Sequence, residues 1–469
     1  MTSRDQLTGK RVVVFGFGRQ GAALARWLPT VGAEVVVTDS RSVKQLNLRR
    51  RDYPGVRFYL GGHPEDVLIG ARCICVSGGV PLDLPILSLA RERGIPFTND
   101  AQLFLERCPA PVIGITGSAG KTTTTALVAK IVANSGYKVW VGGNIGNPLI
   151  EDLPRIKADH IVVMELSSFQ LELMTQSPRV AALLNLTPNH LDRHGTFENY
   201  AKAKANIFRF QRHSDMAVLG WDSPGSRVFE SAVAGELLAF SLYDMVPDGA
   251  FVLGSRLLVA GSASFDANPH VVCEREDIGL RGDHNTLNVL AACAITGGMG
   301  LAIDRPGVMP EVMRASIREF EPVEHRLEQV RTLDGVTWVN DSIATAPERL
   351  LAALSSYDEP LVLLIGGADK DLPWEAAIQF ALRKAKHIIL FGEDGEKQVA
   401  TKVAKLLDML RVGDDQFSRA PNLEEAVTRA AEVAEAGDVV LLSPGGTSYD
   451  AYADFAARGL HFRQLVTEL

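Results

Sequence analysis

The sequence VIGITGSAGKTTTT, at residues 112–125, joins an apolar run to a glycine-rich turn and a Lys-Thr pair. Its first four residues are typical of a buried parallel strand, and residues 125–132 are typical of a helix. Glycines between a strand and a helix let backbone N–H groups and the positive helix end face phosphate oxygens. The stretch therefore predicts a triphosphate-binding loop in which Lys121 reaches the β- and γ-phosphates and Thr122 holds Mg²⁺.

This loop is a variant of the common pattern G-x-x-x-x-G-K-[ST], because Ile115 stands where that pattern has its first glycine. An ordinary glycine turn before a helix is the alternative interpretation. The lysine, the threonines and both flanking elements agree with phosphate binding, which we favour. The expected phosphate-binding residues are Gly117, Ser118, Ala119, Gly120, Lys121, Thr122 and Thr123.

Length and composition describe a multidomain globular protein. The 469 residues suggest about three domains, and 46% apolar with 22% charged residues is usual for a soluble chain. The net charge of −8 argues against a nucleic-acid partner. The first residues do not resemble a signal peptide, and the most apolar stretch, residues 289–303, is shorter than the roughly 18 residues of a membrane span. Five cysteines without a C-x-x-C pattern suggest reduced thiols, so we expect a cytoplasmic protein without membrane contact.

A second glycine motif lies near the start of the chain. Strand 11–15, helix 22–28 and strand 33–37 surround Gly16, Gly18 and Gly21, which match G-x-G-x-x-G. Asp39 follows at the distance of a ribose-binding acid. Taken alone, the motif indicates an NAD site, but it shows only that some phosphate group meets a helix N-terminus. Strand 71–76 ends in another turn suited to ligand contact, at Ser77.

The segment after the phosphate loop supplies candidate metal ligands. Glu165 ends the apolar run 160–165 and is expected to hold Mg²⁺; a capping or surface glutamate is the alternative. Strand 180–186 leads to His190, Asp192 and His194, which invite a zinc interpretation. No cysteine or further histidine cluster lies nearby, so we favour His190 as a residue at the carboxyl end of the sheet.

Two helices of this segment carry polar residues with open roles. In helix 199–208, Lys202 and Lys204 lie about 200° apart and cannot do the same job. By themselves both are expected to be solvated. In helix 285–292, Asn285 and Asn288 share a face, where their amides either read a purine edge or cap the helix. Residues 220–280 gave no functional interpretation.

The last part of the chain, from about residue 321, is a further unit of alternating strands and helices. We expect strands at 336–342, 361–365, 387–391 and 439–442, and helices near 373–385, 395–408, 423–435 and 449–458. The predicted fold is α/β with three domains: a Rossmann-like domain at 1–108, a central P-loop ATPase-type parallel-sheet domain at 109–320, and a second Rossmann-like domain at 321–469.

Several blocks together resemble the Mur ligases of bacterial cell-wall synthesis, over nearly the whole chain. They are GGNIG, MELSSFQLE, NHLDRHG, ENYAKAKANIF, GDHNTLN, EHR, NDSIAT, LIGGADK and LLSPGGTSYDAY. The block beginning at Glu165 and the C-terminal Ser-Pro block are most similar to the members that add D-glutamate. The resemblance implies an ATP-dependent, amide-forming ligase of peptidoglycan precursor synthesis.

The resemblance also implies ligands for each domain. The first domain would bind UDP-N-acetylmuramoyl-L-alanine, with the glycine loop at the diphosphate and Asp39 near the uracil. The central domain would bind ATP and the third D-glutamate, in a monomer. The implied substrate-binding residues are Gly18, Arg19, Gln20, Asp39, Ser77, Asn144, Thr345, Lys370, Ser448 and Phe455.

By the same resemblance, Lys121, His190 and Lys204 are the catalytic residues. Thr122 and Glu165 would hold one Mg²⁺, and His190 a second. Lys204 matches a lysine that the family carbamylates, which resolves its role against that of Lys202. Asn285, Asn288, Arg326 and Asp341 would lie near the adenine, the phosphates and the ribose.

The implied reaction passes through an acyl phosphate and a tetrahedral intermediate, and we expect the domains to close over it. Two residues depart from the family. Ile343 stands where many relatives carry a lysine, which weakens the expected charge around the amino-acid substrate. Gly78 stands where proline is usual, which puts the rigidity of that turn in doubt.

Three other functions share part of this sequence pattern. An NAD(P)-dependent oxidoreductase would leave the phosphate loop, Glu165 and the third domain without a role. A non-catalytic nucleotide sensor would be expected to lack Lys121, Glu165 or His190. A sister ligase for meso-diaminopimelate or lysine, or a folylpolyglutamate synthase, shares the ATP-binding core, so the third domain decides between them.

Overall fold

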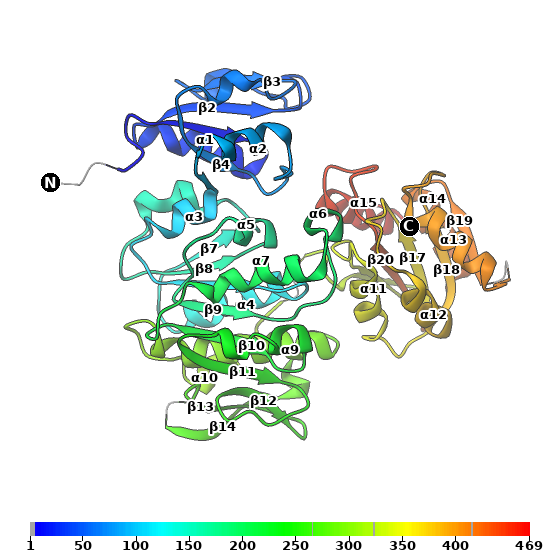
Figure 1. Ribbon diagram of the computed structural model, residues 1–469. Coiled ribbons are helices and arrows are strands. Elements are labelled where there is room, and N and C mark those ends of the chain that lie inside the picture. The colour runs from blue at the N-terminus through cyan, green and yellow to red at the C-terminus, as the bar shows by residue number, and fades with distance from the viewer. Residues whose placement is uncertain (1–4, 265, 322–323, 414–415) are drawn as a thin grey trace. The chain divides into compact units, whose positions relative to one another are not determined.

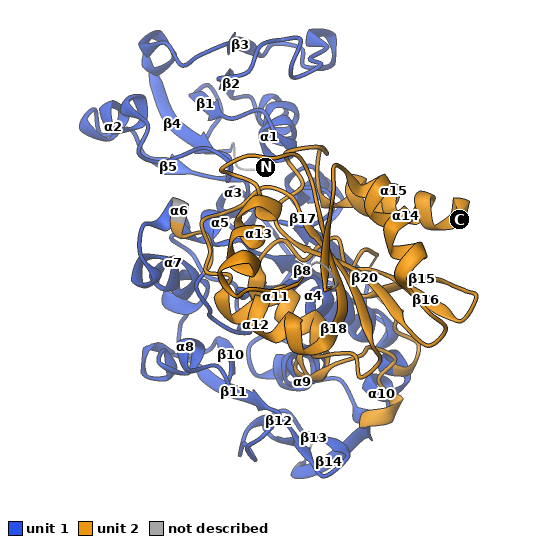
Figure 2. Ribbon diagram, turned by 90° about the vertical axis from the view of Figure 1, so that its right-hand side faces the viewer, with its two compact units in different colours: residues 1–188, 193–274, 288–317 blue, residues 189–192, 275–287, 318–469 orange. Residues whose placement is uncertain are grey.

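The computed structural model describes residues 5–264, 266–321, 324–413 and 416–469, without the side chains of Asp192 and Ala267. It contains three β-sheets that follow one another along the chain (Figure 1). The chain divides into two compact units (Figure 2). Unit 1 comprises residues 1–188, 193–274 and 288–317, and unit 2 comprises residues 189–192, 275–287 and 318–469.

The first sheet has five parallel strands in the order β3-β2-β1-β4-β5. The strands are β1 (Arg11–Phe15), β2 (Glu34–Asp39), β3 (Arg57–Leu60), β4 (Ala71–Val76) and β5 (Phe97–Thr98). The helices are α1 (Arg19–Thr30), α2 (Pro85–Glu92) and α3 (Asp100–Leu105). Residues 12–15 of β1 are fully buried, as expected for a central strand covered on both faces. This order is that of a Rossmann-like domain.

The second sheet has nine strands in the order β14-β13-β12-β11-β10-β9-β6-β8-β7. Its phosphate-loop half contains β6 (Val112–Thr116), β7 (Val139–Gly143), β8 (Ile161–Glu165), β9 (Val180–Leu183) and β10 (Met216–Gly220). Its helices include α4 (Lys121–Asn134), α5 (Ser168–Glu172), α6 (Leu191–His194), α7 (Phe197–Arg209), α8 (Pro224–Arg227), α9 (Asp283–Gly298) and α10 (Pro310–Arg318). All pairs from β7 to β12 are parallel, so the carboxyl ends of β6, β8 and β9 share one edge.

Residues 220–280, for which the sequence suggested no role, extend this second sheet. They form β11 (Glu236–Ser241), β12 (Gly249–Leu253), β13 (Arg256–Gly261) and β14 (Ala267–Glu274). The last three strands pair antiparallel. The central sheet is therefore mixed, and its antiparallel end lies away from the phosphate loop.

The third sheet has six strands in the order β15-β16-β20-β17-β18-β19. They are β15 (Glu328–Leu333), β16 (Val336–Asn340), β17 (Leu361–Gly366), β18 (Ala385–Phe391), β19 (Phe417–Ala420) and β20 (Val439–Gly445). The helices are α11 (Pro347–Leu354), α12 (Glu375–Lys384), α13 (Val399–Met409), α14 (Leu423–Val433) and α15 (Phe455–Glu468). The strands from β16 to β19 are parallel, and core residues cover both faces of the sheet.

The α/β class and the three sheets confirm the predicted fold, with one helix misplaced. The C-terminal helix was expected at 449–458, but α15 begins at Phe455 and continues to Glu468. The Asp454 side chain caps it by accepting from the Ala457 N–H, while the N–H groups of residues 451 and 452 donate to the carbonyl of Ser448 in a turn. The sequence pattern of this turn was mistaken for the helix.

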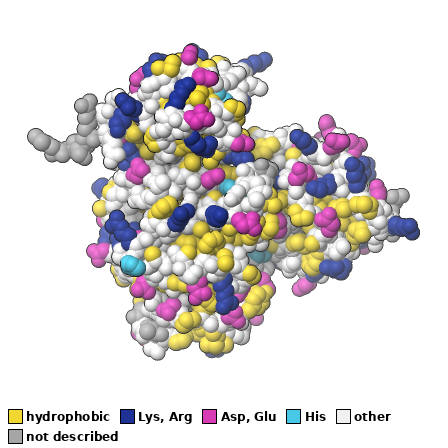
Figure 3. Space-filling view, viewed as in Figure 1, with side chains coloured by type: hydrophobic (Ala, Val, Ile, Leu, Met, Phe, Trp, Pro, Cys, Tyr) yellow, Lys and Arg dark blue, Asp and Glu magenta, His cyan; other side chains and the backbone are white. Residues whose placement is uncertain are grey.

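The surface carries both signs of charge, with basic and acidic side chains interspersed on the face shown in Figure 3. Among the described residues, no helix is long and apolar enough to cross a membrane.

Candidate active site

The phosphate loop lies between the end of β6 and the start of α4. The Asn185 side chain makes two hydrogen bonds to the backbone of this loop. Its Oδ1 accepts from the Ala119 N–H at 2.8 Å, and its Nδ2 donates to the Ala119 carbonyl at 3.1 Å. Gly120 has φ = 83°, and a Cβ there would collide with the side chain of Asn288. The loop therefore needs glycine at this position for two reasons, its backbone and its neighbour.

Lys121 and Lys204 both contact this loop. The Lys121 Nζ donates to the carbonyl oxygens of Gly117, at 2.9 Å, and Ser118, at 3.3 Å. The Lys204 Nζ donates to the Gly117 carbonyl, at 2.9 Å, and to the Thr116 hydroxyl, at 3.0 Å. The fold brings Lys121 and Lys204 together although they are more than 80 positions apart in the sequence.

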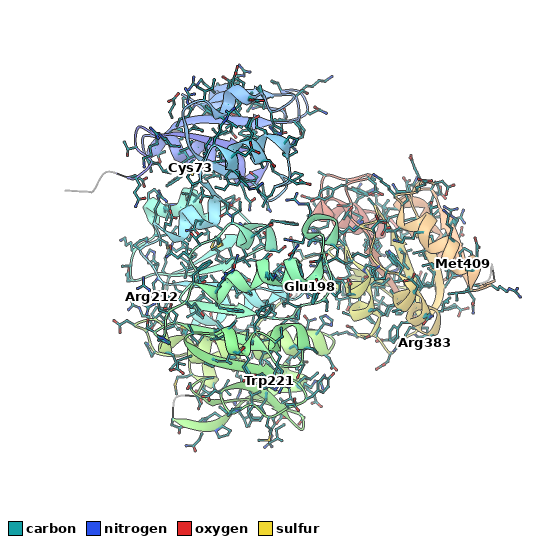
Figure 4. The ribbon with its side chains drawn as sticks, in the orientation of Figure 1. Cys73, Glu198, Arg212, Trp221, Arg383 and Met409 are labelled. Atoms are coloured by element: carbon teal, nitrogen blue, oxygen red, sulfur yellow. The ribbon has the colours of Figure 1, made fainter. Side chains whose placement is uncertain are left out.

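The placement of Lys204 also separates it from Lys202. Helix α7 buries Lys204, which is only 2% exposed, whereas Lys202 is exposed to solvent. The Lys204 Nζ lies 5.2 Å from the centre of the Tyr200 ring, one turn earlier on α7. The Tyr200 and Ser118 hydroxyls lie 2.9 Å apart, so Tyr200 joins α7 to the phosphate loop. Figure 4 labels Glu198, in the first turn of the same helix.

Tyr200 is a site residue that the sequence analysis missed. Its spacing of four residues from Lys204 was the available signal, because residues i and i+4 share a helix face. Asn185 carried no comparable signal, since it follows β9 in an irregular segment.

Glu165 is buried at the end of β8, with 1% exposure, and both of its carboxylate oxygens accept hydrogen bonds. The Thr122 hydroxyl donates to Oε2 at 2.9 Å, and the Asn144 Nδ2 donates to Oε1 at 2.7 Å. Mg²⁺ prefers oxygen ligands at about 2.1 Å in octahedral geometry, which places neighbouring ligands about 3 Å apart. The Thr122 and Glu165 oxygens, 2.9 Å apart, fit two adjacent positions of such an ion.

Among the described residues, no three His, Cys, Asp or Glu side chains gather as a metal site. A magnesium site beside a triphosphate does not need such a cluster, because phosphate, hydroxyl and water oxygens supply the other ligands. The zinc interpretation gains no support. The His194 Nε2 lies 3.0 Å from the Ser168 hydroxyl, and its ring stacks on Phe169 at 5.4 Å. The Asp192 side chain lies outside the described residues.

The glycine motif of the first domain is organised around Asp39. Its carboxylate accepts from the Phe17 N–H at 2.7 Å and from the Arg41 guanidinium at 2.8 Å. Burial alone would raise the pKa of Asp39, but the hydrogen bonds from Arg41 and Phe17 outweigh burial and lower it. Asp39 is thus ionised and fixes the turn that begins the motif.

The other residues predicted to bind the UDP-linked substrate lie on the same turns. Gly18 precedes α1, the Ser77 hydroxyl donates to the Gly16 carbonyl at 3.0 Å, and the Gln20 side chain accepts from the Gly78 N–H at 3.2 Å. The N–H of Gly78, which a proline would lack, is therefore hydrogen-bonded. Beside this turn is a cavity of about 270 Å³ lined by Phe17, residues 46–49, Asp52 and Tyr53.

Arg19 contacts the segment that follows β7. Its guanidinium donates to the carbonyl oxygens of Gly146, at 3.0 Å, and Asn144, at 3.1 Å. The predicted substrate residues Arg19 and Asn144 are therefore in direct contact.

In unit 2, Asp341 follows β16 and is buried. Its carboxylate accepts from the Ser443 hydroxyl at 2.9 Å and from the Leu327 N–H at 3.3 Å. Burial raises the pKa of Asp341 to about 7, against the lowering effect of the Ser443 hydrogen bond and the charge of Arg326. Asn285 and Arg326 line a cavity of about 340 Å³ in the same unit. Asn288 lies in unit 1, where its Oδ1 accepts from the Thr124 hydroxyl at 3.3 Å.

Three of the four residues expected around the amino acid follow the carboxyl ends of β16, β17 and β20, and the fourth, Phe455, begins α15. The Lys370 Nζ lies 3.5 Å from the Thr345 hydroxyl. Ser448 is 2% exposed, whereas Phe455, at the start of α15, is 36% exposed. The loss of a lysine at Ile343 does not leave this loop without a cation, because Arg349 donates to the Ile343 carbonyl at 2.9 Å.

Arg458, to which the sequence analysis assigned no role, hydrogen-bonds to the backbone of this region. It is 1% exposed and donates to the hydroxyl and carbonyl of Ser342 and to the carbonyl of Gly446. Burial lowers its pKa to about 10.

His190 belongs to unit 2, with φ = 53° and its N–H donating to Asn189 Oδ1 at 2.9 Å.

The predicted site residues are divided between the two units. Unit 1 contains the phosphate loop, Glu165, Asn144, Lys204 and Asn288. The remaining predicted residues of the ATP and amino-acid sites lie in unit 2: His190, Asn285, Arg326, Asp341, Thr345, Lys370, Ser448 and Phe455.

Comparison with known proteins defines the class of this protein. Residues 10–99 match the MurD-like N-terminal domain of Mur ligases, residues 115–296 the Mur ligase middle domain, and residues 325–446 the glutamate ligase domain. The chain belongs to the Mur ligase family, whose members are ATP-dependent, amide-forming enzymes of peptidoglycan precursor synthesis.

Curated relatives match this chain over nearly their full lengths, and two of them illustrate the similarity. The UDP-N-acetylmuramoylalanine–D-glutamate ligase of Clostridium botulinum (strain Langeland) is 37% identical over 468 residues, 99% of this chain and 98% of the relative. The ligase of the same name from Symbiobacterium thermophilum is 39% identical over 466 residues, 98% of each chain.

The solved structures share the fold at lower identity. The UDP-N-acetylmuramate–alanine ligase MurC of Thermotoga maritima has a TM-score of 0.59 at 18% identity, covering 98% of this chain and 99% of that one. The MurF ligase of the same organism, in complex with ADP, has a TM-score of 0.57 at 19% identity, covering 99% and 97%.

Proposed function

We propose that this chain joins D-glutamate to UDP-N-acetylmuramoyl-L-alanine, with ATP as the phosphoryl donor. The observation that carries the proposal is the convergence of Lys121 and Lys204 on the phosphate loop beside the Thr122–Glu165 pair. The two relatives of this name support the choice of substrates. We assign the UDP-linked substrate to residues 1–108, ATP to 109–320 and D-glutamate to 321–469, in a cytoplasmic monomer.

The first chemical step makes the alanyl carboxylate reactive. A carboxylate is a poor electrophile, so one of its oxygens attacks the γ-phosphorus of ATP, forming an acyl phosphate and releasing ADP. Negative charge grows on the phosphoryl oxygens in this step. Lys121, at the start of α4, supplies positive charge at that point.

Thr122 and Glu165 would hold one Mg²⁺, whose charge when bound offsets that of the phosphoryl oxygens. His190 would hold a second ion, and we expect Lys204 to carry a carbamate, whose oxygens are suitable Mg²⁺ ligands. Asn144 keeps the Glu165 carboxylate in place by donating to Oε1. Asn285, Asn288, Arg326 and Asp341 would position the rest of the nucleotide.

The second step forms the amide. The neutral D-glutamate amine attacks the acyl carbon, giving a tetrahedral oxyanion that collapses by expelling phosphate. The nitrogen gives up one proton, which leaves with the phosphate, and keeps the other as the amide N–H. Thr345, Lys370, Ser448 and Phe455 would hold the amino acid, with Lys370 paired to a substrate carboxylate. Closure over the site would protect the acyl phosphate from water.

The decisive experiment measures phosphate release from ATP in the presence of UDP-N-acetylmuramoyl-L-alanine. D-glutamate, L-glutamate, L-lysine and meso-diaminopimelate are offered in turn, and the product is weighed by mass spectrometry. We expect release only with D-glutamate, with a product heavier by one glutamyl residue. Release with another amino acid would overturn the assignment of unit 2, and no release would overturn the ligase itself.

A further inference from the structure

One face of α1 holds the segment of the central domain that follows β7. Arg19 and Arg26 are seven residues apart, two helical turns, and therefore share this face. Arg19 donates to the carbonyl oxygens of Asn144 and Gly146. Arg26 forms a bidentate salt bridge with Glu151, in which Nε and Nη2 donate to the two carboxylate oxygens at 2.7 and 2.8 Å. All these residues belong to unit 1.

The two arginines differ in whether their partners contact the proposed Mg²⁺ ligand Glu165. The Asn144 backbone N–H donates to the Glu165 carbonyl at 2.9 Å, and its side chain donates to Glu165 Oε1 at 2.7 Å. Gly143 pairs directly with Glu165 in the sheet, and a Cβ at Gly143 would collide with the Glu165 carbonyl. The segment held by Arg19 is therefore the one that orients the proposed Mg²⁺ ligand. Glu151, held by Arg26, lies beyond this segment in a separate 3₁₀ helix, Leu149–Arg155.

The other end of Arg19 belongs to the glycine motif. Gly18 precedes α1 and Arg19 is its first residue, so the backbone that would face a diphosphate also carries this guanidinium. A ligand that orders this turn also orders Arg19. Continuous hydrogen bonds then lead from the turn through Asn144 to Glu165 and Thr122.

We propose that Arg19 is a positioning residue that couples the UDP-linked substrate site of the first domain to the Mg²⁺ ligands beside the phosphate loop. The inference rests on the proposed function, because it takes Glu165 and Thr122 as Mg²⁺ ligands. Coupling between two sites is reciprocal, so the UDP-linked substrate and Mg²⁺-dependent nucleotide binding strengthen each other. This role differs from a direct contact between Arg19 and the diphosphate, since the two terminal guanidinium nitrogens donate to carbonyl oxygens of the central domain.

The test measures binding of a fluorescent ATP analogue as Mg²⁺ is titrated, with and without UDP-N-acetylmuramoyl-L-alanine. In the unaltered protein, the UDP-linked substrate should lower the half-saturating Mg²⁺ concentration. Arg19→Ala should raise that concentration about fivefold and abolish the effect of the UDP-linked substrate. Arg19→Lys should give an intermediate result, because an ammonium lacks the planar fork that reaches two carbonyls.

Arg26→Ala is the matched control, since it removes an arginine from the same helix face without touching the Asn144 segment. It should leave the half-saturating Mg²⁺ concentration and the coupling unchanged. The inference is wrong if Arg19→Ala alters only the affinity for the UDP-linked substrate, or if Arg26→Ala changes the Mg²⁺ dependence equally. Nucleotide binding that does not depend on Mg²⁺ in the unaltered protein would instead contradict the proposed function, and this inference with it.

Discussion

Lys121 and Lys204 share one acceptor: the Nζ atom of each lies 2.9 Å from the carbonyl oxygen of Gly117. One lysine comes from the start of α4 and the other from α7, and the shared carbonyl lies in the phosphate loop. Two ammonium groups on one carbonyl repel each other and concentrate positive charge beside the proposed triphosphate. Conversion of the Lys204 amine to a carbamate would reverse its charge and make it an oxygen ligand for Mg²⁺.

Lys204→Ala should therefore reduce phosphate release at least about 100-fold, because it removes a buried group of the proposed metal site. Acetate or formate should restore part of the activity, since a small carboxylate can enter the space and replace the carbamate oxygens. The measurement is the rate of phosphate release with increasing carboxylate.

Lys202→Ala is the control for this prediction, since Lys202 is on the same helix but exposed. It should retain nearly full activity and show no response to acetate. Full activity of Lys204→Ala without added carboxylate would contradict the carbamate assignment.

Lys121→Ala and Asp39→Asn test whether the nucleotide and UDP-linked substrates have separate sites. Lys121→Ala should lower turnover about 100-fold or more, because positive charge at the γ-phosphate is lost, and should leave UDP-substrate affinity largely intact. Asp39→Asn should do the reverse, since it weakens the hydrogen bonds that hold the Phe17 turn and leaves the phosphate loop untouched. Calorimetric titration with each ligand gives both affinities. Equal loss of both affinities in either variant would show that the sites are not independent.

Much of this fold was accessible from the sequence because its central strands are buried on both faces. The predicted strands 11–15 and 71–76 contain the continuous apolar runs 12–15 and 73–76, and both strands have the predicted bounds in the structure. Residues 220–280 contain short strand-like runs, but no strand bounds were predicted there, and the sequence does not reveal that the edge of the sheet turns antiparallel. The start of the last helix was also predicted wrongly, because residues 448–452 form a turn and α15 begins only at Phe455.

The candidate site was predictable only where one local motif contains it. The phosphate loop is such a motif. The hydrogen bond between Asn144 and Glu165 depends on the register of β7 against β8, which the sequence does not reveal. Arg458 was given no role because an arginine is normally expected at the surface, and only the tertiary fold buries it.

Arg458→Lys should lower the free energy of unfolding of the protein by about 2–4 kcal/mol, because a lysine cannot reproduce the forked hydrogen bonds to Ser342 and Gly446. The KM for D-glutamate should rise as well, since these bonds hold the loops that carry the proposed amino-acid residues. Denaturant unfolding and steady-state kinetics measure the two effects.

Arg383→Lys provides the comparison, since Arg383 is exposed on α12 of the same unit (Figure 4). It should change neither quantity appreciably. If Arg458→Lys behaves like Arg383→Lys, the hydrogen bonds of Arg458 do not stabilise the protein as inferred.

The raised pKa of Asp341 predicts that the free energy of unfolding depends on pH. Burial raises its pKa from 3.8 to about 7, so between these values the folded protein keeps a proton that the unfolded chain has lost. The contribution of Asp341 to stability therefore decreases as the pH rises from about 4 to about 7, and then levels off. Asp341→Asn removes this titration because asparagine remains neutral.

The melting temperature of Asp341→Asn, relative to the unaltered protein, should therefore increase steadily between pH 4.5 and about 7.5. Asp358→Asn, at a fully exposed carboxylate of the same unit, should show no such trend. The measurement is thermal unfolding of the three proteins across this pH range at constant ionic strength. A difference that stays constant with pH would mean that Asp341 ionises alike in the folded and unfolded states. A difference of opposite slope would mean that Arg326 and the Ser443 hydroxyl, rather than burial, control its pKa.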